Sequence, residues 1–293
     1  MMEINESTAK WKVRLFALAS VLIVAVLSTA SVGAFDEFGS ATIVGVGGAY
    51  AGARDDAATI WLNPALAVFS PSFVAGSLAT RNLYQLAALQ ERTGSVAVRI
   101  GGKAAVGGGF SQVGQSGLYT ESHAVMVASA KLLSRWALGL GVHYDRVEFG
   151  DGTMAFAGST LDLGVASRPI HEIIACAAVR GIRIDRLYDA NDPPAAVEIS
   201  AAWQGPEITL AGIWSKVSGE RSRFGLGQSL QLARGLPLGV GLTFLSGLRF
   251  DPIRYTLGAR ILARGGSFDY AYQSHPDLGG THVLGVTFQF GAR

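Results

Sequence analysis

The strongest constraint on the fold is an alternation of apolar residues with glycine or polar residues, which recurs from about residue 72 to the C-terminal end. It is clearest in the segments 136–145, 238–250, 253–263 and 280–290. Successive side chains of a β-strand point to opposite faces of the sheet, so a period of two predicts strands with one apolar face. Most of the chain is therefore predicted to be an all-β, antiparallel sheet whose second face is rich in glycine.

Two classes of protein build such strands. A soluble β-sandwich buries the apolar face in its core, and a membrane β-barrel turns that face to lipid. The composition favours the barrel, because 49% of the residues are hydrophobic and only 16% are charged, against about 25% charged in soluble domains. Trp136, Trp203 and Trp214 lie near predicted strand ends, where aromatic residues meet the membrane interface. Open edges would leave unpaired backbone groups in hydrocarbon, so we expect a closed antiparallel transmembrane β-barrel.

Fifteen segments carry a strand pattern, and Gly, Asp, Asn, Pro or charged residues separate them. They lie near 72–80, 83–90, 94–101, 103–112, 121–132, 135–147, 155–167, 172–183, 195–204, 206–217, 221–233, 237–249, 253–264, 267–274 and 280–290. A single-chain bacterial barrel has an even number of strands, so we expect about 14. The two segments that flank Asn82 are expected either to merge into one long strand or to lose one member to the N-terminal part.

The N-terminal residues 1–34 have the features of a secretory signal peptide. Three basic residues precede an apolar run at 15–27, and small residues up to Ala34 offer a cleavage site. We therefore expect an exported protein of the bacterial cell outer membrane, with the signal peptide cleaved near Ala34. The mature chain is predicted to have two parts, an N-terminal hatch or plug segment over 35–71 and the barrel over 72–293.

One stretch of the mature chain, 45–67, has helical rather than strand features. Asp55 and Asp56 are good N-caps for a helical turn, and Asn63 caps a second turn that begins with Pro64. The glycines that precede them allow tight turns and close contact with a surrounding wall. A barrel of about fourteen strands is wide enough to leave an empty lumen unless something fills it. The stretch is therefore predicted to form a short helical hatch inside the lumen.

The same stretch resembles the N-terminal signature of the FadL-like outer-membrane proteins, and most closely that of their PorV/PorQ-type branch. The matching positions are Gly47, Gly48, Ala49, Tyr50, Asp55, Asp56, Asn63, Pro64 and Ala65. The usual glycine after this signature is Leu66 here, and a second match lies near the C-terminus in 268–272 and 277–282. The resemblance implies a 14-stranded barrel with a gating hatch. The hatch and gating candidates are Gly47, Gly48, Asp55, Asp56, Trp61, Asn63, Pro64 and Ala65.

Two functions follow from the resemblance, and the sequence leaves both open. PorV-type members act as attachment or shuttle factors of a secretion system. FadL-like members carry fatty acids or other hydrophobic small molecules across the outer membrane. The implied partners are outer-membrane lipid, the barrel-assembly machinery during biogenesis, and either hydrophobic small molecules or secretion-system proteins.

Polar residues on the predicted inner face are further candidates for a site. Arg249, Arg254 and Arg260 are expected to point into the lumen. Arginine forms two parallel hydrogen bonds with a carboxylate or a phosphate, so these residues can either bind an anionic group or pair with Asp55 and Asp56 of the hatch. Both interpretations stay open.

His143 and Asp145 share one strand face, which we assign to the lumen. A lipid hydrolase would need such a histidine together with a serine on the lipid face, so we favour a polar lumen residue that Asp145 or water satisfies. The formal net charge of +2 does not indicate nucleic-acid binding. The single cysteine, Cys176, lies in an apolar run. No catalytic residue, metal site or cofactor is predicted, and the protein is not expected to be an enzyme.

Overall fold

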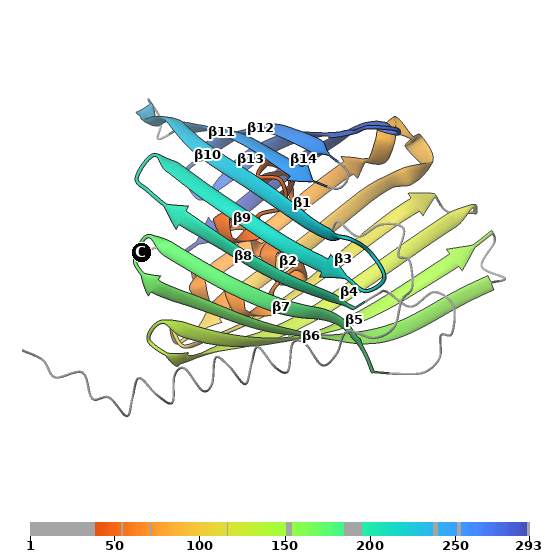
Figure 1. The fold of residues 1–293 in the computed structure, drawn as a ribbon, viewed down its shortest axis with the longest axis horizontal. Helices are drawn as coiled ribbons and strands as arrows, with labels where there is room; N and C mark the ends of the chain where they lie inside the picture. The colour runs from red at the N-terminus through yellow and green to blue at the C-terminus, as the bar shows by residue number, and fades with distance from the viewer. Residues whose placement is uncertain are drawn as a thin grey trace, which may run out of the picture.

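The computed structural model describes residues 39–53, 55–70, 72–115, 117–150, 154–184, 195–236, 240–250 and 253–291. The predicted signal peptide, 1–34, lies outside the described residues. Fourteen β-strands form one closed barrel, in which each strand pairs antiparallel with its neighbours in sequence and the last strand pairs with the first (Figure 1). The predicted fold class is therefore confirmed.

The strands follow one another in chain order around the barrel. They are β1 (Val74–Asn82), β2 (Gln90–Ile100), β3 (Ala104–Gln115), β4 (Tyr119–Leu133), β5 (Trp136–Phe149), β6 (Met154–Ile170), β7 (Ile173–Arg183), β8 (Ala196–Gln204), β9 (Ile208–Val217), β10 (Ser222–Leu236), β11 (Val240–Phe250), β12 (Arg254–Ala263), β13 (Gly266–His275) and β14 (Gly279–Phe290). The closing pair, β1 with β14, runs in register from Val74 opposite Phe290 to Asn82 opposite His282. Closure removes the sheet edges, whose backbone groups would otherwise need another partner.

Of the two segments that flank Asn82, one is not a strand, but it neither merges with its neighbour nor joins the plug, so both expected alternatives for 83–90 are wrong. The chain there makes two single-turn 3₁₀ helices, η4 (Leu83–Gln85) and η5 (Ala87–Leu89), which connect β1 to β2. Tyr84 and Gln85 have φ angles of 54° and 61°, a left-handed conformation that a strand does not accommodate. Without this segment the fifteen candidates become the fourteen strands of the barrel.

The outer face of the wall is apolar and the inner face is small or polar, as the alternation predicts. Along β12, Tyr255, Leu257 and Ile261 are exposed on the outside, whereas Thr256 and Gly258 are buried toward the lumen. The same holds on β5, where alternate apolar residues from 136 to 144 are exposed. The exterior of the barrel is therefore the reverse of a soluble protein surface, on which large apolar patches are rare.

The two ends of the barrel differ in their connections. At the end where the chain enters β1 and leaves β14, successive strands are joined by two or three residues, as at 134–135, 171–172 and 205–207. The longest connections, 83–89 and 184–195, belong to the other end. In outer-membrane barrels the shorter turns face the periplasm, so we call the first end the periplasmic end and the second the outer end.

The N-terminal part of the described chain lies inside the barrel, where Figure 1 shows it in orange. We call residues 39–70 the plug. Its elements are α2 (Ala41–Gly45), η1 (Tyr50–Ala53), η2 (Ala57–Trp61) and η3 (Pro64–Phe69). Tyr50, Ile60 and Trp61 are fully buried, and plug residues make up most of the main hydrophobic core. Among the described residues, no helix has the length and apolarity needed to cross a bilayer. The plug is thus the core around which the wall closes.

Candidate functional site

The helical turns of the plug begin at the polar residues that the sequence indicates. Asp56 Oδ1 accepts a hydrogen bond of 2.9 Å from the backbone N–H of the second residue of η2. Asn63 Oδ1 accepts one of 3.0 Å at the start of η3, where Pro64 occupies the first position. Of the two aspartates, Asp56 rather than Asp55 is the N-cap. These caps satisfy backbone donors at the starts of helices that are too short to be stable alone.

The plug rests on two pairs of wall glycines, and the first pair is on β5 and β6. Gly139 and Gly164 lie directly opposite each other on the inner face. A Cβ on Gly139 would lie 2.3 Å from the backbone N of Ala65, and one on Gly164 would lie 2.2 Å from Asn63 Oδ1. The Asn63–Ala65 turn therefore approaches the wall backbone more closely than any side chain would allow. We call this pair the first seat.

The second seat lies on β10 and β11, where Gly227 and Gly247 are again directly opposite each other. A Cβ on Gly227 would lie 2.1 Å from the carbonyl oxygen of Val46, and one on Gly247 would lie 2.4 Å from the N of Gly47. Gly47 and Gly48 have φ angles of 65° and 80°, so this turn needs glycine for its own conformation as well. The glycine-rich inner face seen in the sequence is thus the surface that holds the plug.

Trp61 anchors the centre of the plug. Its indole Nε1 donates a hydrogen bond of 2.8 Å to Ser95 Oγ on β2. The indole ring covers Gly109 of β3, where a Cβ would lie 2.7 Å from the ring, and its centroid is 5.9 Å from that of the His143 ring. The largest side chain of the plug therefore fills the space that a glycine leaves in the wall, and its one polar atom is satisfied.

Few hydrogen bonds join the plug to the wall. Besides the Trp61 bond, they include Asn63 Nδ2 to the carbonyl of Ala177 at 3.0 Å, the N–H of Ala51 to Ser200 Oγ at 3.3 Å, Thr256 Oγ1 to the carbonyl of Gly45 at 3.0 Å and Gln289 Nε2 to the carbonyl of Asp55 at 3.0 Å. The surfaces between them are apolar, with plug residues such as Leu66 and Val68 in one core with Val125 and Ile174 of the wall. Apolar contact, rather than a polar network, accounts for most of this interface.

Asp56 is the charged centre of the plug. Its carboxylate accepts a hydrogen bond from Ser40 Oγ, the residue that caps α2, so one side chain links two turns of the plug. Burial raises the pKa of Asp56, and the positive charge of nearby Arg260 opposes this shift. Arg260 itself donates a hydrogen bond of 2.8 Å to Asp269 on the neighbouring strand. The expected pairing of the plug acids with inward arginines is therefore present only as an electrostatic attraction between Asp56 and Arg260, whose ion pair is with Asp269.

The other two predicted lumen arginines lie near the outer end. Arg249 and Arg254 are directly opposite each other on β11 and β12. A Cβ on Gly48 would lie 3.7 Å from Arg249 Cζ, so the guanidinium of Arg249 packs beside the Gly47–Gly48 turn of the plug. Arg254 lies on β12, the strand next to the one that carries Arg249. Anion binding by either residue stays a prediction.

His143 faces the lumen as predicted and is 6% exposed, but its expected partner is wrong. Its Nε2 lies 2.8 Å from Asp162 Oδ2 on β6, at an angle unfavourable for a hydrogen bond. Asp145 instead forms a contact of 2.7 Å with His123 Nδ1, directly across from it on β4. The lumen position of His143 does not match the lipid-facing histidine that a membrane lipid hydrolase would need.

The sequence pattern does not identify two ion pairs of the wall, one buried and one partly buried. Arg81 Nε donates to Glu91 Oε2 at 2.6 Å, and Ser111 Oγ donates to the other oxygen of that carboxylate at 3.0 Å. Arg180 Nη1 donates to Glu198 Oε1 at 3.1 Å. All five residues occupy the alternate strand positions that face the lumen. This position in the sequence pattern is the signal that could have identified them. In the described part of the chain, no three His, Cys, Asp or Glu side chains are placed to hold a metal ion.

A cavity of about 540 Å³ lies beside the plug at the periplasmic end. Asp55 and Gly52 of the plug border it on one side, and strands of the β8–β12 half of the wall on the other. Charged and amide residues line it, including Arg260, Glu172 and Glu207. The barrel therefore retains a polar space beside the plug at this end.

Comparison with solved structures shows which proteins share this architecture. The toluene transporter TbuX of Ralstonia pickettii superposes with a TM-score of 0.63 at 11% sequence identity, over 87% of this chain and 99% of that one. The monoaromatic hydrocarbon channel CymD gives a TM-score of 0.60 at 11% identity, covering 85% and 98%. A FadL homologue of Pseudomonas aeruginosa gives 0.57 at 13% identity, covering 86% and 98%.

Comparison of the sequence alone finds no related protein. No protein-family model matches it, and no curated protein matches it. At such low identity the structural matches establish the architecture, and the PorV/PorQ-type branch stays a prediction. The protein therefore has the FadL-like fold, here a closed barrel of fourteen strands with the N-terminal plug inside it.

Proposed function

We propose that the protein is an outer-membrane channel for hydrophobic small molecules, with the plug as its gate. The observation that carries the proposal is the way the plug is held. Its seats are wall glycines, at Gly139 and Gly164 on one side and Gly227 and Gly247 on the other, and most of the interface between them is apolar. Such an interface holds the plug closely with few hydrogen bonds.

The exterior of the barrel supports the location. Large apolar side chains are exposed around the wall, among them Leu78, Met126, Leu140, Ile199 and Leu257. In water such a surface would aggregate, whereas in a bilayer it is the surface that lipid covers. Closed β-barrels that span a membrane are typical of the bacterial outer membrane. If the short turns face the periplasm, the start of β1 and the end of β14 also lie on the periplasmic side.

The apolar interface also favours hydrophobic cargo. An apolar molecule that enters between plug and wall replaces the apolar contacts it breaks with apolar contacts of its own, so little hydrophobic burial is lost. A polar solute would expose the same surfaces to water. The names of the matched structures, toluene transporters and a monoaromatic hydrocarbon channel, describe cargo of this chemical class.

A secretion-associated role, as in the PorV branch, is the second candidate. The observation that favours it is the small size of most outer connections, such as 218–221 and 276–278, which leave the outer rim open to a protein partner. Purification from native outer membrane, followed by mass spectrometry of co-eluting proteins and lipids, separates the two roles. A stoichiometric protein partner would favour the secretion role.

The gate is tested by a matched pair of substitutions on β5. Gly139→Ala places a Cβ 2.3 Å from the plug backbone, so the plug must shift. Gly141→Ala, two residues away on the same face, meets its nearest neighbour at an ordinary 3.4 Å. We expect the first variant to raise ion conductance in a planar bilayer and the second to resemble the unmodified protein. Heat-modifiable gel mobility confirms that each barrel is folded.

Cargo is tested separately with toluene as the probe. Intact cells that make the protein should take up toluene faster than cells with an empty vector, because the lipopolysaccharide leaflet slows apolar compounds. Equal uptake in the two strains, with the barrel shown to be present in the outer membrane, would contradict transport. Equal conductance of the two glycine variants would contradict only the gate.

A further inference from the structure

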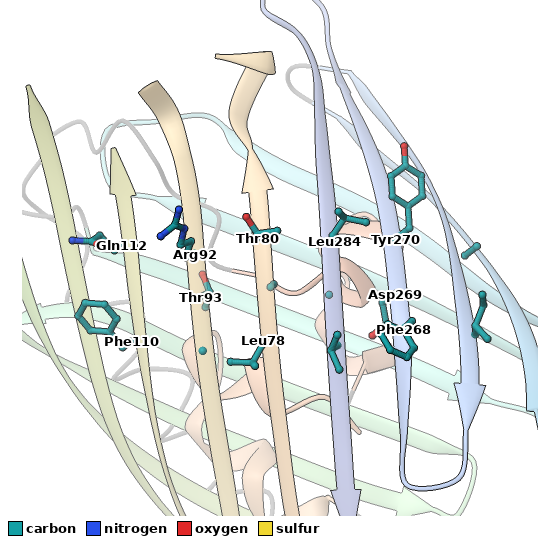
Figure 2. A pocket seen from close by; sticks show the side chains of 16 residues that line it. Leu78, Thr80, Arg92, Thr93, Phe110, Gln112, Phe268, Asp269, Tyr270 and Leu284 are labelled. Atoms are coloured by element: carbon teal, nitrogen blue, oxygen red, sulfur yellow. The ribbon is translucent and has the colours of Figure 1, made fainter. Parts of the chain in front are cut away.

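The outside of the barrel carries a groove that channel function does not explain. It crosses six neighbouring strands, from β12 through β13, β14, β1 and β2 to β3, and encloses about 810 Å³. Figure 2 shows its side chains, most of which point away from the lumen. The volume falls within the range of roughly 300–1,000 Å³ that is usual for small-molecule sites. The groove is open to the surroundings of the barrel, and its volume is sufficient for a small ligand.

Strand register places the outward-facing lining residues in two rows, above a floor of Ala79, Thr93, Gly285 and Asp269, the last of which is paired with Arg260. The row nearer the periplasmic end is apolar throughout and consists of Ile261, Phe268, Val286, Leu78, Gly94 and Phe110. The row nearer the outer end changes character along its length: Ala259, Tyr270 and Leu284 are followed by Thr80, Arg92 and Gln112. The groove thus has an apolar body and a polar corner on β1, β2 and β3.

The depth of the groove has an identifiable cause. Gly94 lies between the large side chains of Leu78 and Phe110, both more than half exposed, and leaves a gap between them. Beneath the rows, Ala79 of β1 and Gly285 of β14 are directly opposite each other and contribute small residues to the floor. A Cβ on Gly94 would lie 3.3 Å from Leu78 Cδ2, so a larger residue there would fill the groove.

The polar corner carries a positive charge that its neighbours do not balance. The cross-strand neighbours of Arg92 are Thr80 and Gln112, and its guanidinium donates a hydrogen bond of 3.3 Å to Gln90. All three neighbours are uncharged. Another outward arginine near the outer end, Arg146 on β5, forms an ion pair with Glu148. Arg92 is therefore placed to attract an anion from outside the protein.

We propose that this groove binds one membrane lipid with an anionic phosphate headgroup. The acyl chain lies over Leu78, Val286 and Phe268, and the phosphate meets Arg92, with the side-chain amide of Gln112 as a hydrogen-bond donor. The charge at one corner and the apolar body next to it match an amphipathic molecule that already surrounds the wall. The inference rests on the membrane location in the proposed function and is independent of the plug.

The probes are two lipids with identical myristoyl chains, the anionic phosphatidylglycerol and the zwitterionic phosphatidylcholine. The full chain is expressed, extracted from the outer membrane in detergent, and titrated with each lipid. Native mass spectrometry then measures the fraction of protein that retains one lipid. An arginine near a lipid surface favours an anionic lipid by roughly fivefold, so we expect about this preference for phosphatidylglycerol.

Two substitutions test the two parts of the groove. Arg92→Gln should abolish the preference between the lipids while some binding of both remains. Gly94→Leu should lower retention of both, because it fills the apolar body. The matched controls are Arg146→Gln and Gly212→Leu. Gly212 is an outward glycine of β9 whose Cβ would meet Leu226 at an ordinary 3.6 Å.

Each outcome of this experiment decides the proposal. Loss of preference in Arg92→Gln, together with loss of retention in Gly94→Leu and unchanged controls, supports it. Equal retention in all variants would show only the general lipid belt and would overturn it. A dimer whose contact Gly94→Leu abolishes would assign the groove to a second copy and overturn it as well. We expect conductance to be the same in all of these variants, so failure of the lipid proposal is distinguishable from failure of the channel proposal.

Discussion

At the scale of single residues, the Asn63 side chain links the plug to the wall. Its Oδ1 caps η3, and its Nδ2 donates to the wall carbonyls of Ala177 and Val165. Asn63→Ala should therefore loosen residues 64–69, by about 1 kcal/mol for the lost cap alone. Amide hydrogen exchange of these residues measures the effect. Asn82→Ala is the control, because Asn82 precedes η4 without a side-chain capping bond. Equal protection of the plug in both variants would contradict the role of Asn63.

We predict that Asp56 makes the seating of the plug depend on pH. Its ordinary pKa is 3.8, and burial raises that of the seated form. The seated plug then holds the proton more tightly than a displaced plug, so seating is strongest below pH 3.8 and weakens as pH rises through the raised pKa. We expect conductance to increase with pH over this window, and Asp56→Asn to flatten the increase. A curve that is unchanged in Asp56→Asn would assign the dependence to other groups.

His143 shows what a residue pattern can and cannot predict. The period of two correctly places its side chain in the lumen, since it depends only on neighbours in the same strand. Its partner, Asp162, lies diagonally across β5 and β6, where His143 is opposite Thr160. Asp145, the nearer residue in sequence, is instead opposite His123. Partners across a sheet depend on register, which the turns and the plug determine together and a single strand does not encode.

At the scale of elements, the two faces of β12 make different predictions. Leu257→Arg places a charge on the lipid side and should destabilise the barrel by about 2–4 kcal/mol near the bilayer midplane. Thr256→Ala, one residue away, removes the hydrogen bond to Gly45 of the plug. We expect it to loosen the plug and to leave the barrel nearly as stable. Unfolding in lipid vesicles compares the two variants, and similar losses of stability would contradict the face assignment.

The connection between β1 and β2 is the element that pattern analysis misassigns. Residues 83–90 contain six hydrophobic residues (three leucines, two alanines and a tyrosine) and directly follow a strand, so their pattern resembles that of a further strand. The left-handed φ angles of Tyr84 and Gln85 end the extended conformation, and neither residue is of a type that favours it. Tyr84 instead makes an edge contact with His275 at the outer end of β13, 5.5 Å between ring centroids. The conformation of this connection therefore involves a contact with a residue distant in sequence, which the local pattern does not show.

At the scale of the whole molecule, the plug and wall are expected to be separable. Every strand pairs along the wall without help from plug backbone. Deletion of residues 45–62, with Asn63 onward retained, should leave a folded barrel with raised conductance in a planar bilayer. Heat-modifiable mobility on gels reports the folded barrel. A folded deletion variant with unchanged conductance would show that this stretch does not close the lumen.

The covalent link between η3 and β1 has a consequence for binding. Only residues 70–73 separate Phe69 from the first strand, so a displaced plug cannot diffuse away. A tethered segment behaves like a ligand at an effective concentration on the order of millimolar. Any molecule that opens the lumen therefore competes with a binder that is always present. Its apparent affinity is lowered by that competition. For the channel proposed above, we expect the lumen to close again without an external signal once the competitor has passed.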